Sequence, residues 1–486
     1  MEPQTLQTIV AWSGGTLLSG DPAARTTGIS IDSRSVRPGE LFLALPGKRC
    51  DGHDYAAEAL SRQAAGVIIS RPVPEIGRWP AGGALIRTAD SFRALAGLAR
   101  GYRALFDLTA VAVTGSNGKT TTKDLIARLL NARMETLAAP ASYNNLVGLS
   151  LTILRLEKRH RAVVFELGMN RPGEIRELAD ICRPGAGVIT NVGLAHIGYF
   201  GSVDEIAAEK EALLGGLTGE KAAFLNVDDR RVAAMAGSAR GPVIGFGFGP
   251  SARIRASDPQ LLPDGARFRV ALSGGELTID SPLPGRHNLY NLLAALAVAD
   301  HCGVPPETIR ETVRTAALPP RRLEKVRVGE ATVINDAYNA NPASMRAALE
   351  AWLGMESGGR RIMVSGDMNE LGTFSVAEHR AWGAVLGGAG LDRLIFVGPR
   401  SRDAAAAAVD RGFPGKKVHA VGDCRAAAAV LRDVIRPRDS ILIKGSRVME
   451  MEEIVEELTN NTKSKAQNAD VDAACTASER NNGVLE

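Results

Sequence analysis

The sequence predicts an α/β protein with three domains: a small N-terminal α/β domain, a central domain built on a mainly parallel sheet, and a C-terminal domain with a second parallel sheet. The length of 486 residues is enough for several domains of ordinary size. At residues 108–130 a short apolar run leads into a glycine-containing turn and a helical pattern, as in the strand–loop–helix units of parallel sheets. Residues 331–443 alternate short apolar runs with helical stretches, which favours a parallel sheet with crossover helices.

The first block, residues 1–85, has the pattern of a small α/β unit. We expect a strand at Leu41–Leu45, followed by a loop rich in glycine and aspartate. A helix and a second strand at Val67–Ser70 complete the pattern. We therefore assign this block to a separate N-terminal domain.

The second block, residues 86–318, opens with a helix and contains the glycine-rich turn. The strands that we expect around this turn are Leu108–Val113, Ala162–Phe165 and Gly187–Thr190. Residues 222–283 alternate short strands with turns of glycine, proline and aspartate, which predicts an antiparallel flap. A helix with the sequence NLYNLLAALAVAD closes the block.

The third block, residues 319–460, reads as a Rossmann-like domain. The expected parallel strands are Ala331–Asn335, Ile362–Ser365, Leu394–Val397, Val418–Val421 and Ile441–Ile443. Its first helix begins with Asn341 as the N-cap and Pro342 at the first helical position. The remaining residues, 461–486, are polar and lack periodicity, so we expect a disordered tail.

Composition argues against several classes of protein. The formal net charge of +4 is small for this length, and no block of lysine and arginine supports a nucleic-acid partner. The five cysteines are widely spaced without a CxxC pair, which fits a reducing compartment and no structural zinc site. We see neither a signal-peptide pattern nor an uncharged apolar stretch of about 20 residues. We therefore expect a cytoplasmic protein with no membrane span.

The segment AVAVTGSNGKTTTKDLIARLL, residues 110–130, is the most informative motif. Its glycines allow consecutive backbone N–H groups to turn toward an anion, and the following helix adds its positive end. The GxxGKT spacing is not that of a Walker A loop, because Val113 stands where that loop has its first glycine. Lys119 can still reach the outer phosphates of a nucleotide, and the Thr120 hydroxyl can ligate Mg²⁺. The loop alone leaves an ordinary strand–turn–helix with a surface lysine as the alternative.

Two polar side chains follow apolar runs, the place where open parallel sheets bind their ligands. Glu166 ends the run Ala162–Phe165, so its carboxylate is well placed to hold Mg²⁺ beside the loop. The alternative is a strand-end acid in solvent. His196 follows another strand, and a histidine there is on its own more often a hydrogen-bonded core or loop residue.

Three further residues lie on helices. Lys210 belongs to an amphipathic helix and would ordinarily be a solvated cation. Asn288 and Asn291 are three residues apart and share one helix face. An amide can read both the donor and the acceptor on adenine. Helix capping by Asn288 is the alternative, and both roles are compatible.

The loop resembles the TGxxGKTT element of the Mur ligases, the ATP-dependent amide ligases of peptidoglycan synthesis. The resemblance runs through all three blocks and covers about residues 25–457. The matching segments are DSRSVRPGELFLALPG with DGHDY, SYNNLVGLSLTIL, FELGMNRPGEI, NVGLAHIGYFGS, AAEKEALL, GRHNLYNLLAALA, PPRRLEKV, INDAYNANPASM, GDMNELG and KGSRVMEME.

The resemblance implies an activity with its cofactors and partners. We expect an ATP-dependent ligase that joins D-alanyl-D-alanine to UDP-N-acetylmuramoyl-tripeptide through an acyl phosphate, with ATP and Mg²⁺. The combination of FELGMNRPGE, NDAYNANP and GDMNELG favours the dipeptide as the incoming group. We expect the protein to be a monomer.

The resemblance also assigns roles to residues. In this family the lysine at the place of Lys210 is often carbamylated, which requires a lowered lysine pKa and creates a carboxylate for a second Mg²⁺. Glu209 and Glu211 are its neighbours, so an alignment with the family shifted by one position would place one of them at this site instead. The implied catalytic residues are Lys119, Glu166, His196 and Lys210, and the implied metal ligands are Thr120, Glu166, His196 and carbamylated Lys210.

The binding residues fall into two sets. ATP would contact Gly115, Ser116, Asn117, Gly118, Lys119, Thr120, Thr121, Asn288, Asn291, Arg322 and Asp336. The UDP-linked precursor would contact Asp32, Ser33, Arg34, Gly47, Asp51, Gly52 and His53 of the first block, with Ser142, Asn144 and Asn145 near the loop. Candidates for the dipeptide and for domain closure are Asp367, Asn369, Glu370, Lys444, Ser446 and Arg447.

The alternative functions are two other ligase reactions and a binding protein without catalytic activity. A ligase that adds a single amino acid to the UDP-muramoyl-dipeptide carries an Asp-[Asp/Asn]-Pro-Arg element, which we do not find in the third block. A folate polyglutamate synthase would not explain the first block. A catalytically silent binding protein would not need Lys119, Thr120, Glu166 and His196 together.

Overall fold

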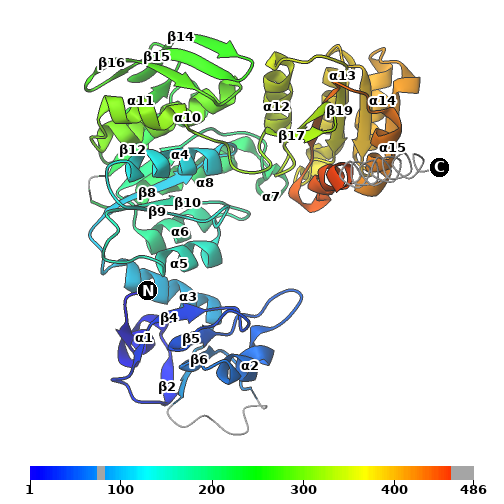
Figure 1. The fold of residues 1–486 in the computed structure, drawn as a ribbon. Helices are drawn as coiled ribbons and strands as arrows, with labels where there is room; N and C mark the ends of the chain where they lie inside the picture. Colours follow the sequence, from blue (N-terminus) through cyan, green and yellow to red (C-terminus); the bar gives the residue numbers. More distant parts are fainter. Residues whose placement is uncertain (74–82, 220, 461–486) are drawn as a thin grey trace, which may run out of the picture.

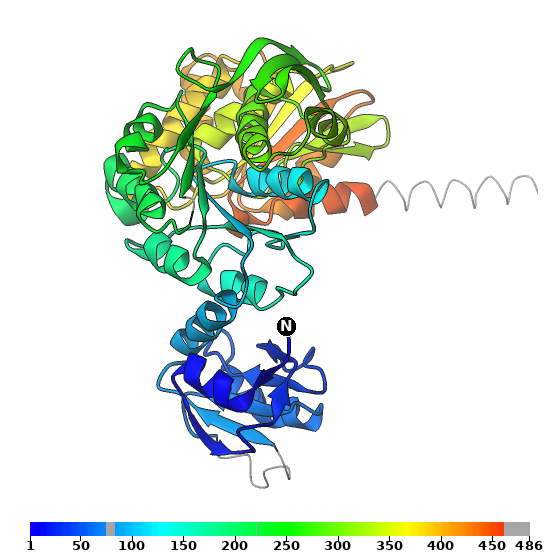
Figure 2. The same ribbon diagram turned by 90° about the vertical axis from the view of Figure 1, so that its left-hand side faces the viewer.

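The computed structural model describes residues 1–73, 83–219 and 221–460. Three α/β units follow one another along the chain, and the central one lies between the other two (Figure 1). Figure 2 shows the N-terminal unit below the other two, which pack against each other. The predicted tail lies outside the described residues. Among the helices of the described part, none is long and apolar enough to cross a membrane.

The N-terminal domain is a five-stranded sheet in the order β2-β7-β6-β5-β4, with a two-stranded ribbon of β1 and β3. Side chains alternate along β5, because Leu41 and Leu43 join one apolar cluster while Phe42 joins another. The two expected strands are found with shifted ends. The elements are β1 (Gln4–Thr5), α1 (Leu6–Ser13), β2 (Thr16–Ser19), β3 (Arg25–Thr26), β4 (Gly28–Ser30), β5 (Glu40–Leu43), α2 (Ala56–Ser61), β6 (Gly66–Ile69) and β7 (Ala84–Arg87).

The central domain holds a nine-stranded sheet in the order β16-β15-β14-β13-β12-β11-β8-β10-β9. Its first part comprises α3 (Ser91–Arg103), β8 (Thr109–Thr114), α4 (Lys119–Asn131), β9 (Thr136–Ala138), α5 (Leu146–Ile153), β10 (Ala162–Glu166), α6 (Glu174–Cys182), β11 (Ala186–Ile189), α7 (Ile197–Phe200) and α8 (Val203–Gly215). Its second part comprises β12 (Ala222–Asn226), α9 (Arg230–Ala234), β13 (Val243–Gly247), β14 (Ile254–Leu262), β15 (Gly265–Leu272), β16 (Gly275–Ser281), α10 (Arg286–His301) and α11 (Pro306–Arg314).

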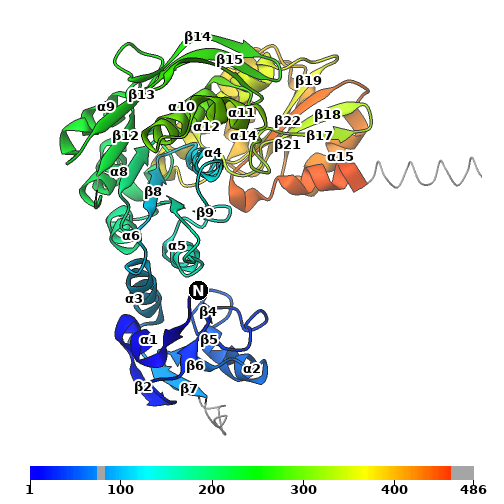
Figure 3. The ribbon, with the colours of Figure 1, turned by 60° about the vertical axis from the view of Figure 1, so that its left-hand side comes forward.

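Both faces of this sheet are buried along β8, β10, β11 and β12, which explains the continuous apolar runs of these strands. Strands β15 and β16 instead alternate buried and exposed residues. Along β8, Ala110 and Ala112 contribute to a different apolar cluster from Val111 and Val113. Helices α4, α10 and α11 cover one face, and α5, α6 and α8 cover the other (Figure 3). The loop after β8 therefore lies at the carboxyl edge of a sheet that is covered on both faces.

The predicted antiparallel flap is smaller than expected. Strands β12 and β13 pair in parallel and extend the central sheet, whereas only β14, β15 and β16 pair antiparallel. The expectation for residues 222–283 was therefore wrong over its first part. The turn residues between β12 and β13 enclose the short helix α9, which makes the connection a crossover instead of a hairpin.

The C-terminal domain is a six-stranded sheet in the order β17-β18-β22-β19-β20-β21. The parallel strands and the helix start at Asn341 and Pro342 are confirmed, and the Asn341 side chain accepts a hydrogen bond from the backbone N–H of Ser344. Strand β17, which pairs antiparallel at the edge, was not expected. The elements are β17 (Glu324–Val328), β18 (Ala331–Asn335), α12 (Pro342–Gly354), β19 (Arg361–Gly366), α13 (Ser375–Gly387), β20 (Arg393–Val397), α14 (Ser401–Asp410), β21 (Val418–Val421), α15 (Cys424–Val434) and β22 (Ser440–Lys444).

Candidate active site

The predicted phosphate loop connects β8 to α4 and needs both of its glycines. Gly115 and Gly118 have φ angles of +149° and +81°. A Cβ on Gly115 would lie 1.9 Å from Thr190 Oγ1, and one on Gly118 would lie 2.1 Å from Asn291 Oδ1. The loop therefore packs directly against two neighbouring segments, and only glycine fits at these positions.

The connection that follows β11 holds the loop in shape. The backbone N–H of Asn117 donates to Asn191 Oδ1 at 2.9 Å, and Thr190 Oγ1 donates to the carbonyl of Asn117 at 2.6 Å. Ser116 Oγ accepts from the N–H of Gly193 at 2.8 Å. These bonds order the loop before any ligand binds, which lowers the entropy cost of binding.

Lys119 is the first residue of α4, and its ammonium folds back over the loop. Its Nζ donates to the carbonyl of Gly115 at 2.7 Å and approaches that of Ser116 at 3.4 Å. Burial lowers the pKa of Lys119, which the nearby Glu166 opposes and Arg322 reinforces. The cation therefore stands at the helix N-terminus, where the loop amides also favour an anion.

Glu166 has the features of a cation ligand. Its Oε1 accepts from Asn144 Nδ2 at 2.9 Å, whereas its Oε2 is buried and has no hydrogen-bond partner among the described residues. A buried carboxylate oxygen without a partner is costly, so a bound cation is its natural complement. The described residues contain no cluster of three or more His, Cys, Asp or Glu side chains in ligand positions, so further oxygen donors would have to come from Thr120, water or substrate.

His196 sits at the opposite wall, at the junction of two domains. It has a φ angle of +66° at the start of α7, and its Nδ1 lies 2.8 Å from Glu370 Oε2 in the C-terminal domain. The contact lowers the pKa of Glu370, because the imidazole favours the ionised carboxylate. With Nδ1 turned toward this carboxylate, Nε2 is the ring nitrogen left for a ligand.

Lys210, on α8, is 1 % exposed, with its Nζ 3.5 Å from Met169 Sδ. Burial, and secondly the charge of Lys119, lower its pKa well below the ordinary value, whereas Glu209 opposes the shift. The lysine therefore has the lowered pKa that carbamylation requires, although its role as a metal ligand remains a prediction. It is not among the residues that line the cavity described below.

The two glutamates beside Lys210 have other tasks. Glu209 accepts from the backbone N–H groups of Gly173 and Ile175, both at 2.7 Å, and so satisfies the N-terminus of α6. Glu211 accepts from Ser238 Oγ at 2.5 Å near the surface. Of the three neighbouring residues, Lys210 is therefore the one without such a task.

A cavity of about 530 Å³ opens between the central and C-terminal domains. The predicted site residues that line it are Ser116, Asn117, Gly118, Lys119, Thr120, Thr121, Asn144, Glu166, His196, Asn288, Asn291, Arg322, Asp336, Asn369, Glu370 and Lys444. The predicted residues outside its lining are Gly115, Lys210, Ser142, Asn145, Asp367, Ser446, Arg447 and all of those in the N-terminal domain.

Asn288 and Asn291 meet on the buried face of α10. Asn291 Nδ2 donates to Asn288 Oδ1 at 3.1 Å, and Asn288 Nδ2 donates to the carbonyl of Pro284 at 2.8 Å. Helix capping by Asn288 was the wrong alternative, because α10 begins at Arg286 with Gly285 as its N-cap. Base recognition by this pair remains a prediction.

Arg322 crosses from the C-terminal domain to the phosphate loop. Its Nη2 donates to Thr120 Oγ1 at 2.9 Å, and its guanidinium lies 4.1 Å from the centroid of the Tyr338 ring. Tyr338 in turn contacts the hydroxyl of Ser142 in the central domain. These contacts bring a planar cation from one domain to the anion site of the other, as its predicted role requires.

Asp336 and Lys444 form a buried ion pair. Lys444 Nζ lies 2.7 Å from Asp336 Oδ2 and 2.9 Å from the carbonyl of Asn339. Asp336 Oδ1 accepts from the backbone N–H of Leu323 at 3.1 Å. The carboxylate expected on the ribose is thus already engaged on both oxygens, and its ribose contact remains a prediction.

His287 also lines the cavity, although it was not among the predicted site residues. Burial lowers the pKa of His287 to about 4. The charge of Asp336 opposes this shift, whereas the charge of Lys444 reinforces it. The imidazole is therefore neutral at physiological pH. Its position next to Asn288 in GRHNLYN was the sequence signal that could have identified it. Tyr338, from the segment INDAYNANP, also lines the cavity.

Several predicted substrate residues of the C-terminal domain stabilise their own loops. Asp367 is 3 % exposed and accepts from the backbone N–H groups of Ser401 and Arg400 at the start of α14. Ser446 Oγ accepts from the N–H of Asn369 at 2.7 Å. Arg447 pairs with Glu452, which raises the pKa of the guanidinium. These contacts explain their sequence pattern without a substrate, and their binding role stays a prediction.

The predicted residues of the N-terminal domain also form contacts within their own domain. His53 is 1 % exposed, contacts Asp51 Oδ1 through Nδ1 at 2.6 Å and accepts from the N–H of Ser70 through Nε2 at 2.9 Å. Ser33 donates to Glu58 at 2.9 Å. The remaining four residues shape the surrounding loops, namely Asp32, Arg34, Gly47 and Gly52. Both ring nitrogens of His53 are thus engaged within the domain.

The fold and the cavity define an enzyme of the Mur ligase family, to which this chain belongs. The family models described as the Mur ligase family catalytic domain, the Mur ligase middle domain and the Mur ligase glutamate ligase domain match residues 25–103, 113–299 and 321–447. They cover each of the three structural units in turn.

The names of individual relatives indicate one particular reaction within this family. The chain is 38% identical to UDP-N-acetylmuramoyl-tripeptide--D-alanyl-D-alanine ligase of Mycobacterium leprae, over 89% of this chain and 94% of that protein. A crystal structure of MurF from Acinetobacter baumannii superimposes with a TM-score of 0.86 at 32% identity, covering 95% of this chain and 99% of the other. The MurF ligase of Thermotoga maritima in complex with ADP gives a TM-score of 0.78 at 27% identity, covering 90% and 99%.

Proposed function

We infer that this protein is the ATP-dependent ligase that joins D-alanyl-D-alanine to UDP-N-acetylmuramoyl-tripeptide in peptidoglycan synthesis. Its relatives along nearly the whole chain carry the name of this activity. The structural observation that carries the inference is the cavity in which the phosphate loop meets Arg322 from the C-terminal domain and the unpartnered oxygen of Glu166. Such a cavity suits the transfer of a phosphoryl group to a carboxylate.

The first step forms an acyl phosphate. A terminal carboxylate oxygen of the tripeptide attacks the γ-phosphorus of ATP, the bond to the bridging oxygen breaks, and ADP leaves with the electron pair. Lys119, the loop amides and Arg322 neutralise the charge that builds on the phosphoryl oxygens, and their fixed positions contribute much of the rate. Thr120, Glu166 and His196 would hold Mg²⁺, with Lys210 if carbamylated, and the metal would add charge neutralisation at the phosphates.

The second step forms the amide. The free amine of D-alanyl-D-alanine attacks the acyl carbon, giving a tetrahedral intermediate. The carbon–oxygen bond to phosphate then breaks, and the departing phosphate takes up the proton that the amine loses. Further closure of the two domains over the bound substrates would keep water from an intermediate that it would hydrolyse.

The experiment combines phosphate release with the mass of the product. The full-length protein is incubated with MgATP and either UDP-N-acetylmuramoyl-tripeptide, in its lysine and diaminopimelate forms, or UDP-N-acetylmuramoyl-dipeptide. Each acceptor is combined with D-alanyl-D-alanine or with single amino acids. We expect phosphate release and product only when UDP-N-acetylmuramoyl-tripeptide and D-alanyl-D-alanine are both present. Product from the UDP-muramoyl-dipeptide with a single amino acid would instead establish the alternative ligase.

A further inference from the structure

Lys123 is a buried cation next to the phosphate loop that the mechanism does not use. It lies one helical turn after Lys119 on α4, is 1 % exposed and does not line the cavity. Its Nζ donates to the carbonyls of Ala139 and Ala141 at 2.6 and 2.9 Å and lies 2.8 Å from Asp124 Oδ1. All three donors of the ammonium are thus engaged, two of them by one short segment.

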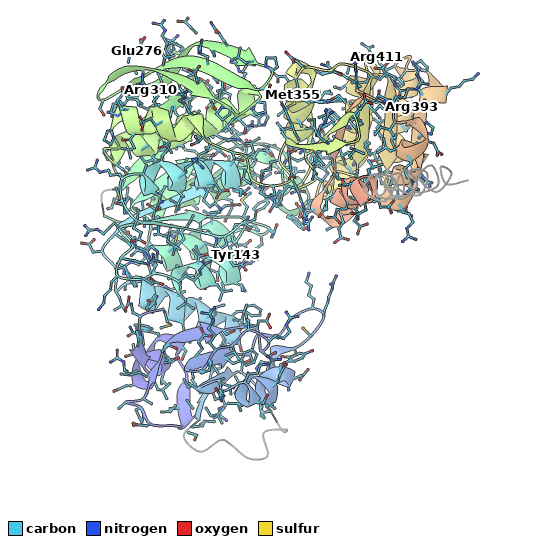
Figure 4. The ribbon with its side chains drawn as sticks, viewed as in Figure 1. Tyr143, Glu276, Arg310, Met355, Arg393 and Arg411 are labelled. Atoms are coloured by element: carbon cyan, nitrogen blue, oxygen red, sulfur yellow. The ribbon has the colours of Figure 1, made fainter. Side chains whose placement is uncertain are left out.

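That segment, residues 139–145, follows β9, which packs beside α4 (Figure 3). Ala141 has a φ angle of +42°, which an alanine adopts only under constraint. Figure 4 labels the exposed Tyr143 of this segment at the surface of the central domain. A strained connection of this kind needs a contact that stabilises it, and the two bonds from Lys123 flank the strain.

The segment delivers two side chains to the active site. Asn144 Nδ2 donates to Glu166 Oε1 at 2.9 Å, and the carbonyl of Asn144 accepts from the N–H of Gly168 at 2.8 Å. Ser142 Oγ lies 3.4 Å from Thr120 Oγ1 and contacts the hydroxyl of Tyr338 in the C-terminal domain. The segment therefore orients the carboxylate with the unpartnered oxygen and also touches the second domain.

We propose that Lys123 is a positioning residue that ties the segment 139–145 to the phosphate-loop helix and so fixes Asn144 on Glu166. Because Lys119 and Lys123 belong to the same rigid helix, the tie places the phosphate-binding cation and the Glu166 carboxylate in one frame. The ammonium suits this task, since its charge strengthens both bonds to the carbonyls and Asp124 balances it. The inference depends on the proposed function only for its consequences in turnover.

The test compares Lys123→Met with Asp124→Asn. Methionine has nearly the length of lysine but no donor, whereas Asp124→Asn removes a partly buried charge and leaves both bonds to the carbonyls. Hydrogen–deuterium exchange of peptides covering residues 139–145 and 110–130 reports the tie itself. Binding of ADP and the values of kcat and KM report its consequence.

In Lys123→Met we expect exchange at residues 139–145 to rise at least about tenfold, with little change at residues 110–130. The ADP dissociation constant should change less than about threefold, while kcat at saturating substrates falls at least about tenfold. Asp124→Asn keeps both bonds to the carbonyls, so its changes in exchange at residues 139–145 and in kcat should be clearly smaller than those of Lys123→Met. A general loss of structure would lower ADP binding and kcat together.

Unchanged exchange at residues 139–145 in Lys123→Met, or an equal defect in Asp124→Asn, would overturn the proposal. If Lys123→Met fails to fold, Lys123→Gln decides, because its amide can donate to one carbonyl, and exchange at residues 139–145 should then be intermediate. A wild-type protein without ligase activity would contradict the proposed function, while exchange and ADP binding would still test the tie.

Discussion

Lys210 shows how far the environment sets the chemistry of a single residue. An exposed lysine is protonated at physiological pH and cannot react with CO₂. Here burial and the charge of Lys119 lower the pKa of Lys210, which increases the fraction of the neutral amine. Carbamylation would convert this amine into a carboxylate, which is the form that binds a cation.

We predict that Lys210→Ala lowers turnover at least about 100-fold while the protein remains folded, because alanine is favourable in a helix. Acetate should restore part of the turnover by occupying the position of the lost carboxylate. Glu211→Ala is the matched control and should be active, whereas Glu209→Ala should destabilise α6, whose N-terminus it satisfies. Full activity of Lys210→Ala across an acetate series would exclude a catalytic role for the lysine.

His287 makes stability depend on pH in a definite direction. Its pKa in the folded protein is about 4, against an ordinary value of 6.5, so between these values the unfolded chain binds a proton that the native protein does not. Stability should therefore fall as the pH drops from 6.5 to 4, by at most about 3 kcal/mol from this residue. In His287→Gln the free energy of unfolding, measured with urea across this range, should fall less steeply. Parallel curves for the two proteins would contradict the assignment.

At the scale of elements, the phosphate loop and α4 form the unit on which catalysis depends. Lys119 is the first residue of this helix, beside the loop amides. We predict that Lys119→Ala slows ligation by roughly 100-fold or more, equivalent to about 3 kcal/mol, because a charge-assisted contact is lost in the transition state. Lys158→Ala, which removes an exposed lysine elsewhere in the same domain, is the control. Near-normal turnover of Lys119→Ala at saturating ATP would be incompatible with the loop's role.

The elements themselves were largely predictable because their signals are local. The strand Ala331–Asn335 and the N-cap Asn341 were placed correctly, since apolar runs and capping residues act within a few positions. The flap was overestimated, because pairing direction depends on what lies between two strands. Contacts such as Tyr338 with Ser142 join residues 196 positions apart and leave no local signal. The buried role of His53 was missed for the same reason.

In the whole molecule, the cavity lies between two domains that also meet at a close backbone contact. The N–H of Gly198 in α7 donates to the carbonyl of Glu370 at 2.8 Å. A Cβ at Gly198 would lie 2.7 Å from the backbone nitrogen of Gly372. The same contact brings the Glu370 carboxylate to His196, so domain docking and the arrangement of the site are linked.

We predict that Gly198→Ala raises the KM for ATP and lowers kcat about tenfold or more, because the added methyl group separates the two domains. Small-angle scattering should show an increased radius of gyration. Alanine normally favours a helix, so the loss would come from the clash. Gly237→Ala, at a site with open space for a methyl group, is the control and should be neutral. Unchanged kinetics and size in Gly198→Ala would mean that the domains tolerate the separation.

We infer that phosphate passes from ATP to the carboxylate of the tripeptide before the amide forms. The direct test uses UDP-N-acetylmuramoyl-tripeptide with both oxygens of its terminal carboxylate labelled with ¹⁸O, together with D-alanyl-D-alanine and MgATP. We expect each turnover to move one labelled oxygen into the released phosphate and to leave the other in the new amide. Product formation with unlabelled phosphate would contradict this order of steps.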